Sequence, residues 1–348
     1  GITGLHEPVG AGITPGSGPG HFALFGYDPT RYYVGRGVLS ALGIDFDLKR
    51  GDVAARGNFC TVDESGEVTD RRAGRISTET NQKLCDRLRE ITLENAEIQL
   101  QTVKEHRFLF VLRGEGLGPD IMDTDPQETG VKPVAPAATE SGSRKTEAAV
   151  REFLEKAGEL LQDEESANMV LLRGFSTLPV WPSLTEAYGV RAAAIAAYPM
   201  YKGVARLLGM SVYDSDQSME SKITLMRDHW DEHDFFFMHV KKTDSSGEDG
   251  DFGRRIGVIE EVDSAIPELT EQVGVLLVTG DHSTPASMKA HSWHPVPALL
   301  WGRNVRPDLV TQFGERECMR GSLGPRYPAT GLLPLALAHA GCFEKFGA

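Results

Sequence analysis

Short apolar runs alternate with helical patterns through the second half of the chain. A strand that is apolar at every position is buried on both faces, which is typical of a parallel sheet covered by helices on both sides. The pattern therefore predicts an α/β core with a mostly parallel sheet. We assign five strands, at 168–175, 191–199, 234–240, 274–280 and 296–302, and two of the helices, at 200–210 and 251–266.

A different pattern indicates an inserted domain at residues 43–163. Strand patterns with a hairpin signal at 64–66 precede a helical pattern at 81–92, two further strands within 96–116, and a helix at 146–163. The stretch 131–145 is rich in Pro, Ala and Ser and reads as an exposed loop. We expect this insertion to be a smaller α+β domain, and residues 1–42 with 164–348 to form the core domain.

The N-terminal residues 1–37 are rich in Gly and Pro, so we expect mostly loop there, with a short strand starting at His21. The chain begins at Gly1 rather than Met, and we expect an upstream segment to have been removed or to be missing. The first residues show neither the basic nor the apolar region of a secretory signal.

Composition narrows the class of protein. The net charge of −14 disfavours nucleic acid as a partner, and no apolar run approaches the ~20 residues that span a bilayer. Four cysteines, widely separated, have no metal-ligand spacing and indicate reduced thiols in a cytoplasmic protein. An acidic chain can still bind an anionic substrate where arginines converge, and its carboxylates can hold divalent cations.

Polar clusters follow two of the predicted strands. In parallel sheets ligands bind beyond the carboxyl ends of the strands, so these clusters should meet. Asp and His are ligands for divalent metals, and paired metals assist phosphoryl displacement by an oxygen nucleophile such as the glycine-flanked Ser17. An Asp-His pair after a strand can also be only a turn with a helix cap. The candidate metal ligands are Asp244, Glu248, Asp281, His282 and His291.

Three motifs in the same order resemble the archaeal-type cofactor-independent phosphoglycerate mutases of the alkaline phosphatase superfamily. They are PGSGPGHFALFGYDP, FMHVKKTDSSGEDGD, and GDHSTP followed by HSWHPVPALLWG. Segments RGNF, DRRAGR, KEHRFLFVLRGEG and AAYPMYKG match as well, so the resemblance covers essentially the whole chain. It implies an alkaline-phosphatase-like core and an inserted domain that closes over the substrate as a lid.

The resemblance also implies roles for individual residues. Ser17 would take the phosphoryl group of a small phosphorylated acid and return it to the other hydroxyl, without 2,3-bisphosphoglycerate. One metal would be held by Ser17, Asp281 and His282, and a second by Asp244, Glu248 and His291. His21 and His294 are candidates for acid–base assistance. The residues implied to bind the substrate are His21, Arg71, Arg75, Arg107 and Lys202.

Three departures from the family pattern keep other functions open. The family usually opens with a strand ending in Asp-Gly, for which Gly1 leaves no room; Glu248 replaces a frequent His; and Gly18 replaces a frequent Asp. The carboxylate of Glu248 favours Mn or Mg over Zn. The alternatives are a metal-dependent phosphohydrolase or phosphotransferase acting on another small phosphorylated acid or phosphonate, and a member that binds without turnover. The oligomeric state stays open.

Overall fold

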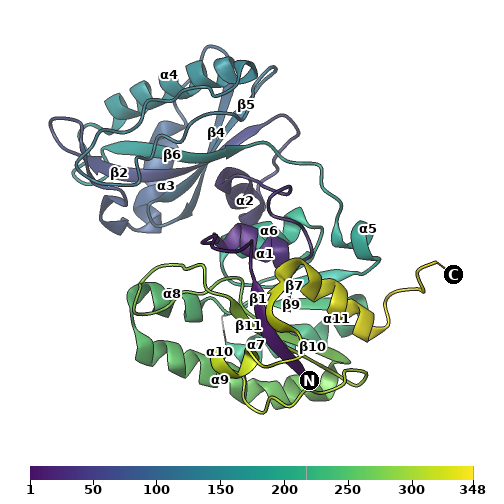
Figure 1. Cartoon of the computed structure of the whole chain (residues 1–348). Helices are drawn as coiled ribbons and strands as arrows, with labels where there is room; N and C mark the ends of the chain where they lie inside the picture. Colours follow the sequence, from purple (N-terminus) through teal and green to yellow (C-terminus); the bar gives the residue numbers. More distant parts are fainter. Residues whose placement is uncertain (217, 348) are drawn as a thin grey trace. The chain divides into compact units, whose positions relative to one another are not determined.

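The chain forms two compact units (Figure 1). The computed structural model describes residues 1–216 and 218–347. We call Gly1–Tyr33 with Trp181–Ala348 the core unit, and Val34–Val180 the insertion unit. The insertion unit is longer than the predicted 43–163 at both ends, and its role as a substrate-binding lid stays a prediction. Among the described residues, no helix is long and apolar enough to cross a membrane.

The core unit contains two sheets rather than the single sheet predicted. In the first, β7 (Ala192–Ile195) lies between β8 (Ser211–Tyr213) and β9 (Phe235–Met238), and both pairings are parallel. The second sheet has the order β10-β11-β1-β12, where β1 and β12 are parallel. Its strands are β10 (Val275–Thr279), β11 (Val296–Gly302), β1 (Ile2–Glu7) and β12 (Gly324–Pro328).

Two strand pairings depart from the predicted parallel arrangement. β11 runs antiparallel to both β10 and β1. A parallel return needs a crossover connection, usually a helix, whereas the connection from β10 to β11 contains none. The long loop that replaces this helix carries several of the candidate site residues.

The N-terminal residues are more regular than their Gly and Pro content predicts. β1 is buried in the second sheet, and His21 lies in helix α1 (Ser17–Leu24), not in a strand. The sequence did not predict β1 because the strand contains polar residues. These residues can be buried because their side chains have hydrogen-bond partners inside the protein. Thr3 Oγ1 donates to Asp308 at 3.0 Å, and His6 Nε2 lies 2.9 Å from Thr279 Oγ1.

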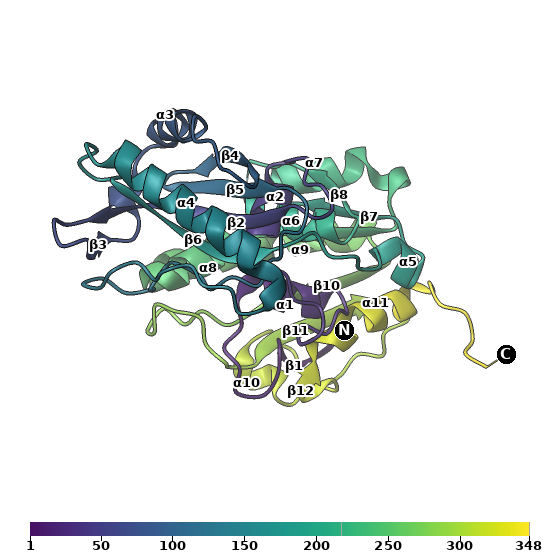
Figure 2. The same ribbon diagram turned by 90° about the horizontal axis from the view of Figure 1, so that it is seen from above.

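Helices surround the sheets of the core unit (Figures 1 and 2). Ile195, Met238 and Leu276 from three strands pack with α7 and α9 in one apolar cluster. The predicted helices 200–210 and 251–266 are confirmed as α6 and α9. Besides α1, the helices of this unit are α5 (Leu184–Tyr188), α6 (Pro199–Leu207), α7 (Met219–Asp228), α8 (Lys242–Asp249), α9 (Phe252–Gln272), α10 (Glu315–Cys318) and α11 (Leu332–Ala340), with 3₁₀ turns at Trp230–Glu232 and Ala329–Gly331.

An antiparallel sheet forms the centre of the insertion unit. β2 pairs with β3, β5 and β6, and β5 also pairs with β4. The run 168–175, predicted as a strand of the core domain, is therefore wrongly placed, because it forms β6 beside β2. The strands are β2 (Val53–Val62), β3 (Val68–Asp70), β4 (Glu97–Lys104), β5 (Arg107–Arg113) and β6 (Met169–Ser176).

The two faces of this sheet differ in character. Val53, Phe59 and Leu172 belong to an apolar core that also contains residues of α3 (Thr78–Leu88) and α4 (Arg144–Leu161). α4 lies over β2 and β6 in Figure 2. Since side chains alternate along a strand, Arg56 and Arg173 lie on the opposite face, which α2 (Arg36–Gly43) partly covers. Further 3₁₀ turns lie at Ala73–Arg75 and Ser141–Ser143.

Candidate active site

The polar segments that follow β9 and β10 meet in the core unit. Asp244 lies in the first turn of α8, His282 follows β10, and His291 lies in the loop before β11. Potential metal-binding atoms of these three residues all lie within 4.8 Å of one another. Residues from three separate segments are thus brought together at the carboxyl ends of the strands.

Ser17 lies against this cluster at the start of α1. Its Oγ is 3.1 Å from His282 Nε2. Gly16 precedes the helix in an extended conformation, so the N–H groups of Ser17 and Gly18 lie in its first turn, where no intrahelical acceptor exists. A serine at a helix N-terminus has both a nucleophilic oxygen and donors suited to a phosphoryl group.

Gly20 allows α1 to approach the strand end. A Cβ atom at this position would lie 2.4 Å from the Asp281 carbonyl oxygen, which is far inside van der Waals contact. The close contact of α1 with the 281–282 peptide therefore requires a residue without a side chain. The glycines around Ser17 thus have two roles: Gly16 precedes α1 in an extended conformation, and Gly20 allows the helix to pack against the strand end.

The hydrogen bonds of Thr284 fix the tautomer of His282. The Thr284 hydroxyl donates to Asp244 Oδ1 at 2.7 Å, so its proton is not available to the histidine. His282 Nδ1 lies 2.9 Å from the same hydroxyl oxygen and must therefore donate to it. Nε2 then carries the lone pair and points it at Ser17, where it can bind a metal or accept a proton.

His291 is oriented in a similar way. Its Nδ1 lies 2.9 Å from the Pro15 carbonyl oxygen, which can only accept, so Nδ1 carries the proton. Nε2 lies 3.7 Å from an Asp244 oxygen and 3.8 Å from a Glu248 oxygen. The side chain of Glu248 is 50% exposed, so it lies at the edge of the cluster. The ring of His291 stacks on that of His282 with centroids 3.7 Å apart.

Asp281 is a buried carboxylate beside two imidazoles. Its Oδ2 lies 3.1 Å from His21 Nδ1 and 3.3 Å from His282 Nε2. Burial alone would raise the pKa of Asp281, but the neighbouring histidines lower it well below its usual value. His21 Nδ1 donates to the Ser17 carbonyl at 2.7 Å, and among the described residues Asp281 Oδ2 has no aligned hydrogen-bond donor. A buried carboxylate oxygen in this situation suits a bound cation.

Sequence reasoning missed two aromatic neighbours of the site. Tyr201 of α6 is buried, and burial together with the charges of Asp281 and Asp244 raises its pKa. The ring of His239, which follows β9, lies 3.6 Å from the ring of Tyr201. Burial lowers the pKa of His239 far below its usual value, so the imidazole is neutral. Its place at the end of an apolar strand, two residues before the polar cluster, was the available signal.

The residues predicted to bind substrate fall into two groups. His21 and Lys202 belong to the core unit, where Lys202 Nζ donates to Asp214 at 2.6 Å. Arg71, Arg75 and Arg107 belong to the insertion unit. The guanidinium of Arg71 binds Asp125, that of Arg107 binds Glu105 at 2.9 Å, and Arg75 is exposed.

His294, the second histidine suggested for acid–base work, lies in the same loop as His291. Its Nδ1 is 2.9 Å from Ser292 Oγ, and its ring stacks on Trp293. Its assignment to acid–base work stays a prediction.

The donor set of the cluster fits a divalent cation. Carboxylate oxygens and imidazole nitrogens bind such ions, and the fixed tautomers of His282 and His291 each leave Nε2 available as a ligand. The carboxylates come from Asp244, Glu248 and Asp281, so hard ions such as Mn²⁺ and Mg²⁺ are well suited.

Solved structures with the same mixed α/β fold indicate the class of protein. The cofactor-independent phosphoglycerate mutase from Thermoplasma acidophilum superimposes with a TM-score of 0.69 and 30% identity, covering 98% of this chain and 89% of that one. A protein from Pyrococcus horikoshii has a TM-score of 0.83 and 30% identity, covering 100% of this chain and 89% of that one. The fold is therefore that of a cofactor-independent phosphoglycerate mutase.

Sequence comparisons identify the family. The family model of 2,3-bisphosphoglycerate-independent phosphoglycerate mutase matches residues 1–167. A probable member from Thermus thermophilus is 50% identical over 351 residues, covering 99% of this chain and 86% of that protein. One from Thermotoga neapolitana is 49% identical over 348 residues, with the same coverage of 99% and 86%. The chain belongs to this family, which confirms the resemblance seen in its motifs.

Proposed function

We propose that this protein interconverts 3-phosphoglycerate and 2-phosphoglycerate through a phosphoserine at Ser17. One observation carries the proposal. Ser17 Oγ lies 3.1 Å from His282 Nε2, inside a cluster of carboxylates and imidazoles, at the N-terminus of a helix. Family membership supports the substrate class.

In the first half of the reaction, Ser17 Oγ forms a bond to phosphorus while the bond from phosphorus to the substrate oxygen breaks. The serine proton leaves to a base in the site, and the departing alkoxide is protonated to give glycerate. The first-turn N–H groups of α1 donate to the phosphoryl oxygens. Glycerate then presents its other hydroxyl, and the same steps in reverse release the isomeric product.

Two divalent cations, Mn²⁺ or Mg²⁺ rather than Zn²⁺, complete the proposed site. Bound there, they would favour the serine alkoxide and neutralise phosphoryl charge. Asp281 and His282 would hold one beside Ser17, and Asp244, Glu248 and His291 would hold the other. We place the activity in glycolysis and gluconeogenesis, and the enzyme in the cytoplasm.

A second function is a phosphohydrolase or phosphotransferase of the same superfamily. Gly18 favours it, because the position beside the nucleophile lacks the carboxylate that the family motif often places there. Water would then take the phosphoryl group from Ser17 in place of the glycerate hydroxyl.

An assay of the metal-loaded protein separates these functions. The substrate is 3-phosphoglycerate without bisphosphoglycerate, and both 2-phosphoglycerate and free phosphate are followed. The mutase predicts 2-phosphoglycerate with little phosphate. Phosphate alone would support hydrolysis, and neither product would mean a different substrate or a member that binds without turnover.

A further inference from the structure

Asp125 of the insertion unit is a buried carboxylate with four hydrogen bonds. Arg71 donates from Nε to Oδ1 and from Nη2 to Oδ2, both at 2.8 Å. Arg173 Nη1 donates to Oδ2 at 3.2 Å, and the Gln127 backbone N–H donates to Oδ1 at 3.0 Å. Burial by itself would raise the pKa of Asp125, but these donors and charges hold it below its usual value. The group is therefore an ionised carboxylate that touches two guanidiniums.

The group of Asp125, Arg71 and Arg173 carries a net positive charge. One carboxylate faces two guanidiniums, which leaves one positive charge. A guanidinium has five N–H donors, and Arg71 uses two of them on Asp125. Arg71 Nη1 has no hydrogen bond within residues 1–216 and 218–347. The side chains of Arg71 and Arg173 are 26% and 15% exposed, so both reach the surface of the unit.

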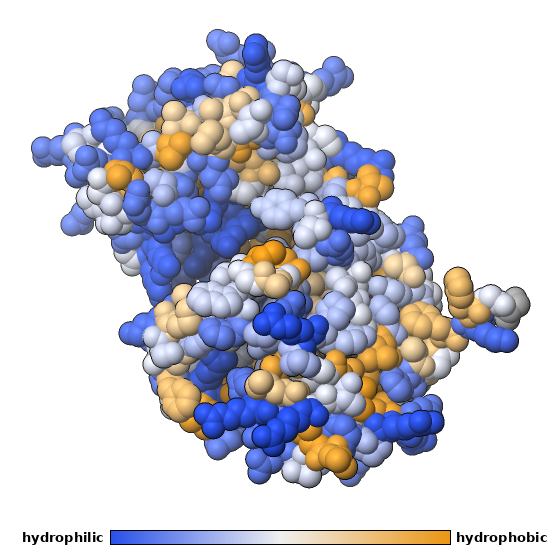
Figure 3. Space-filling model, in the orientation of Figure 1, coloured by the Kyte–Doolittle hydropathy of each residue, from blue (hydrophilic) through white to orange (hydrophobic). Residues whose placement is uncertain are grey.

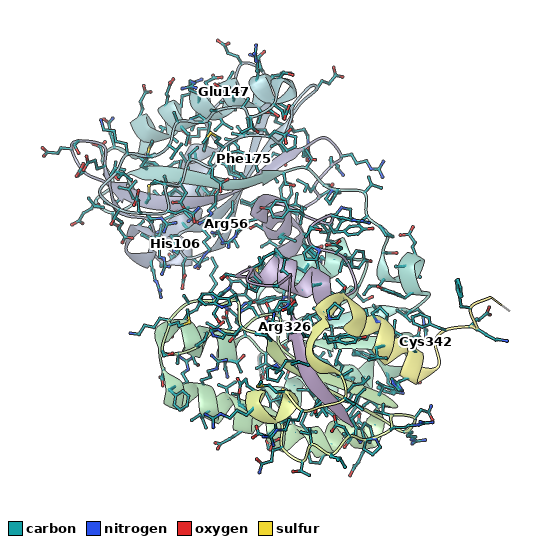
Figure 4. All side chains as sticks on the ribbon, viewed as in Figure 1. Arg56, His106, Glu147, Phe175, Arg326 and Cys342 are labelled. Carbon is teal, nitrogen blue, oxygen red and sulfur yellow. The ribbon has the colours of Figure 1, made fainter. Side chains whose placement is uncertain are left out.

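The same face of the sheet carries further positive charge. Arg56 is the cross-strand neighbour of Arg173 in the β2–β6 register. Burial, followed by the charge of Arg107, lowers the pKa of His106 to about 4, and Arg72 and Arg56 act in the same direction. Figure 4 places Arg56 and His106 away from Glu147 of α4, and that side of the unit is largely hydrophilic in Figure 3.

The position of Asp125 is fixed by its neighbour. The backbone N–H of Thr124 donates to the Leu172 carbonyl, and the Leu172 N–H donates to Thr124 Oγ1, both at 2.8 Å. The loop that carries Asp125 is therefore attached to β6 at the residue before Arg173. A bidentate bond to so rigid a carboxylate removes most of the freedom of the Arg71 guanidinium.

We propose that Asp125 is a positioning residue, which holds Arg71 and Arg173 side by side as a pair that binds an oxyanion of the substrate. The inference rests on the proposed function, since it takes phosphoglycerate as the ligand. The oxyanion is either the carboxylate or the phosphoryl group, both of which accept parallel N–H donors from arginine.

The test compares Asp125→Asn with the matched variant Asp123→Asn. Both remove one charge from the same loop, but Asp123 accepts a hydrogen bond from the Gly174 backbone N–H at 2.6 Å rather than from an arginine. For 3-phosphoglycerate, Asp125→Asn should raise KM and Kd about tenfold or more, with a much smaller change in kcat. Asp123→Asn should leave KM close to the wild-type value, whatever it does to thermal stability.

Calorimetric titration with 3-phosphoglycerate gives Kd even without turnover. An inactive wild-type enzyme would therefore refute the proposed function, while the Kd values would still test the arginine pair. Equal KM and Kd in wild type and a folded Asp125→Asn would overturn the inference, as would equal increases in both variants.

If Asp125→Asn does not fold, Arg173→Gln tests the inference instead, because this variant leaves the Arg71–Asp125 bonds in place. It should also raise KM and Kd, and unchanged values would refute the pair. Inhibition of the wild type and the variants by glycerate and by inorganic phosphate identifies the group that the arginine pair binds. A variant that loses affinity for glycerate identifies the carboxylate, and one that loses affinity for phosphate identifies the phosphoryl group.

Discussion

His282 Nε2 lies 3.1 Å from Ser17 Oγ, although 265 positions separate the two residues in the chain. The contact depends on three features of the core unit. Gly20 lets α1 approach the Asp281 peptide, His282 follows the end of β10, and Thr284 holds the imidazole with its lone pair toward the serine. The packing of the core unit therefore fixes the arrangement of the serine and its neighbours.

Replacing Ser17 with alanine should abolish phosphoryl transfer. The variant lacks the oxygen that we propose takes the phosphoryl group, so 2-phosphoglycerate formation should fall by about a thousandfold or more. Ser264→Ala, on the exposed part of α9, is the matched control and should keep full activity. The measurement is product formation together with covalent ³²P labelling of the protein. Wild-type turnover or labelling in Ser17→Ala would remove Ser17 from the mechanism.

Thr284→Val should weaken metal binding and activity without unfolding the protein. It removes the acceptor of His282 Nδ1 and the donor to Asp244, so both candidate ligands lose their orientation. Loss of such outer hydrogen bonds costs about 10–100-fold in metal affinity or activity. Thr284→Ser keeps the hydroxyl and should recover most of both. Elemental analysis and the mutase assay check this, and unchanged metal content in Thr284→Val would contradict it.

Gly20→Ala should destabilise the core unit and reduce activity. The new methyl group would collide with the Asp281 carbonyl and push α1 away from His282, at a cost of about 1–3 kcal/mol. Gly257→Ala in α9 meets no atom within 4 Å and should be neutral or stabilising by up to ~1 kcal/mol. Denaturant unfolding followed by tryptophan fluorescence reports on this unit alone, because all four tryptophans lie in it. Equal stability of the two variants would show that α1 can move freely.

His6 should make the core unit less stable in acid. Burial lowers its pKa from 6.5 to about 4, so the unfolded chain binds the proton more readily than the folded one. The contribution of His6 to stability is complete above pH 6.5 and is lost as the pH falls toward 4, by about 3 kcal/mol in total. The His6→Gln variant has no titrating group at this position. The unfolding free energy of the variant should therefore depend less on pH between 6.5 and about 4 than that of the wild type. Identical pH profiles of the two proteins would rule out His6 as the source.

Local sequence patterns predicted many elements but not their partners. The apolar runs at 191–199, 234–240 and 274–280 and the helices α6 and α9 form as expected, because burial on both faces and helical periodicity are visible within each segment. The run 168–175 has the same apolar character, yet it joins the insertion unit as β6. An apolar run shows that a strand will be buried, but not against which sheet.

The motifs also predicted the family and a set of candidate ligands, since residue type and spacing are properties of the chain itself. Tertiary structure alone decided which atoms meet. The contact between the rings of His239 and Tyr201, the bond from Thr284 to Asp244 that sets the tautomer of His282, and the sharing of Asp125 by two arginines each join distant segments. Hydrogen bonds act over about 3 Å and depend on direction, so they exist only after packing has placed both partners. The sequence by itself determined the chemical groups and the elements that carry them, and the packing of those elements determined their distances, protonation and charge.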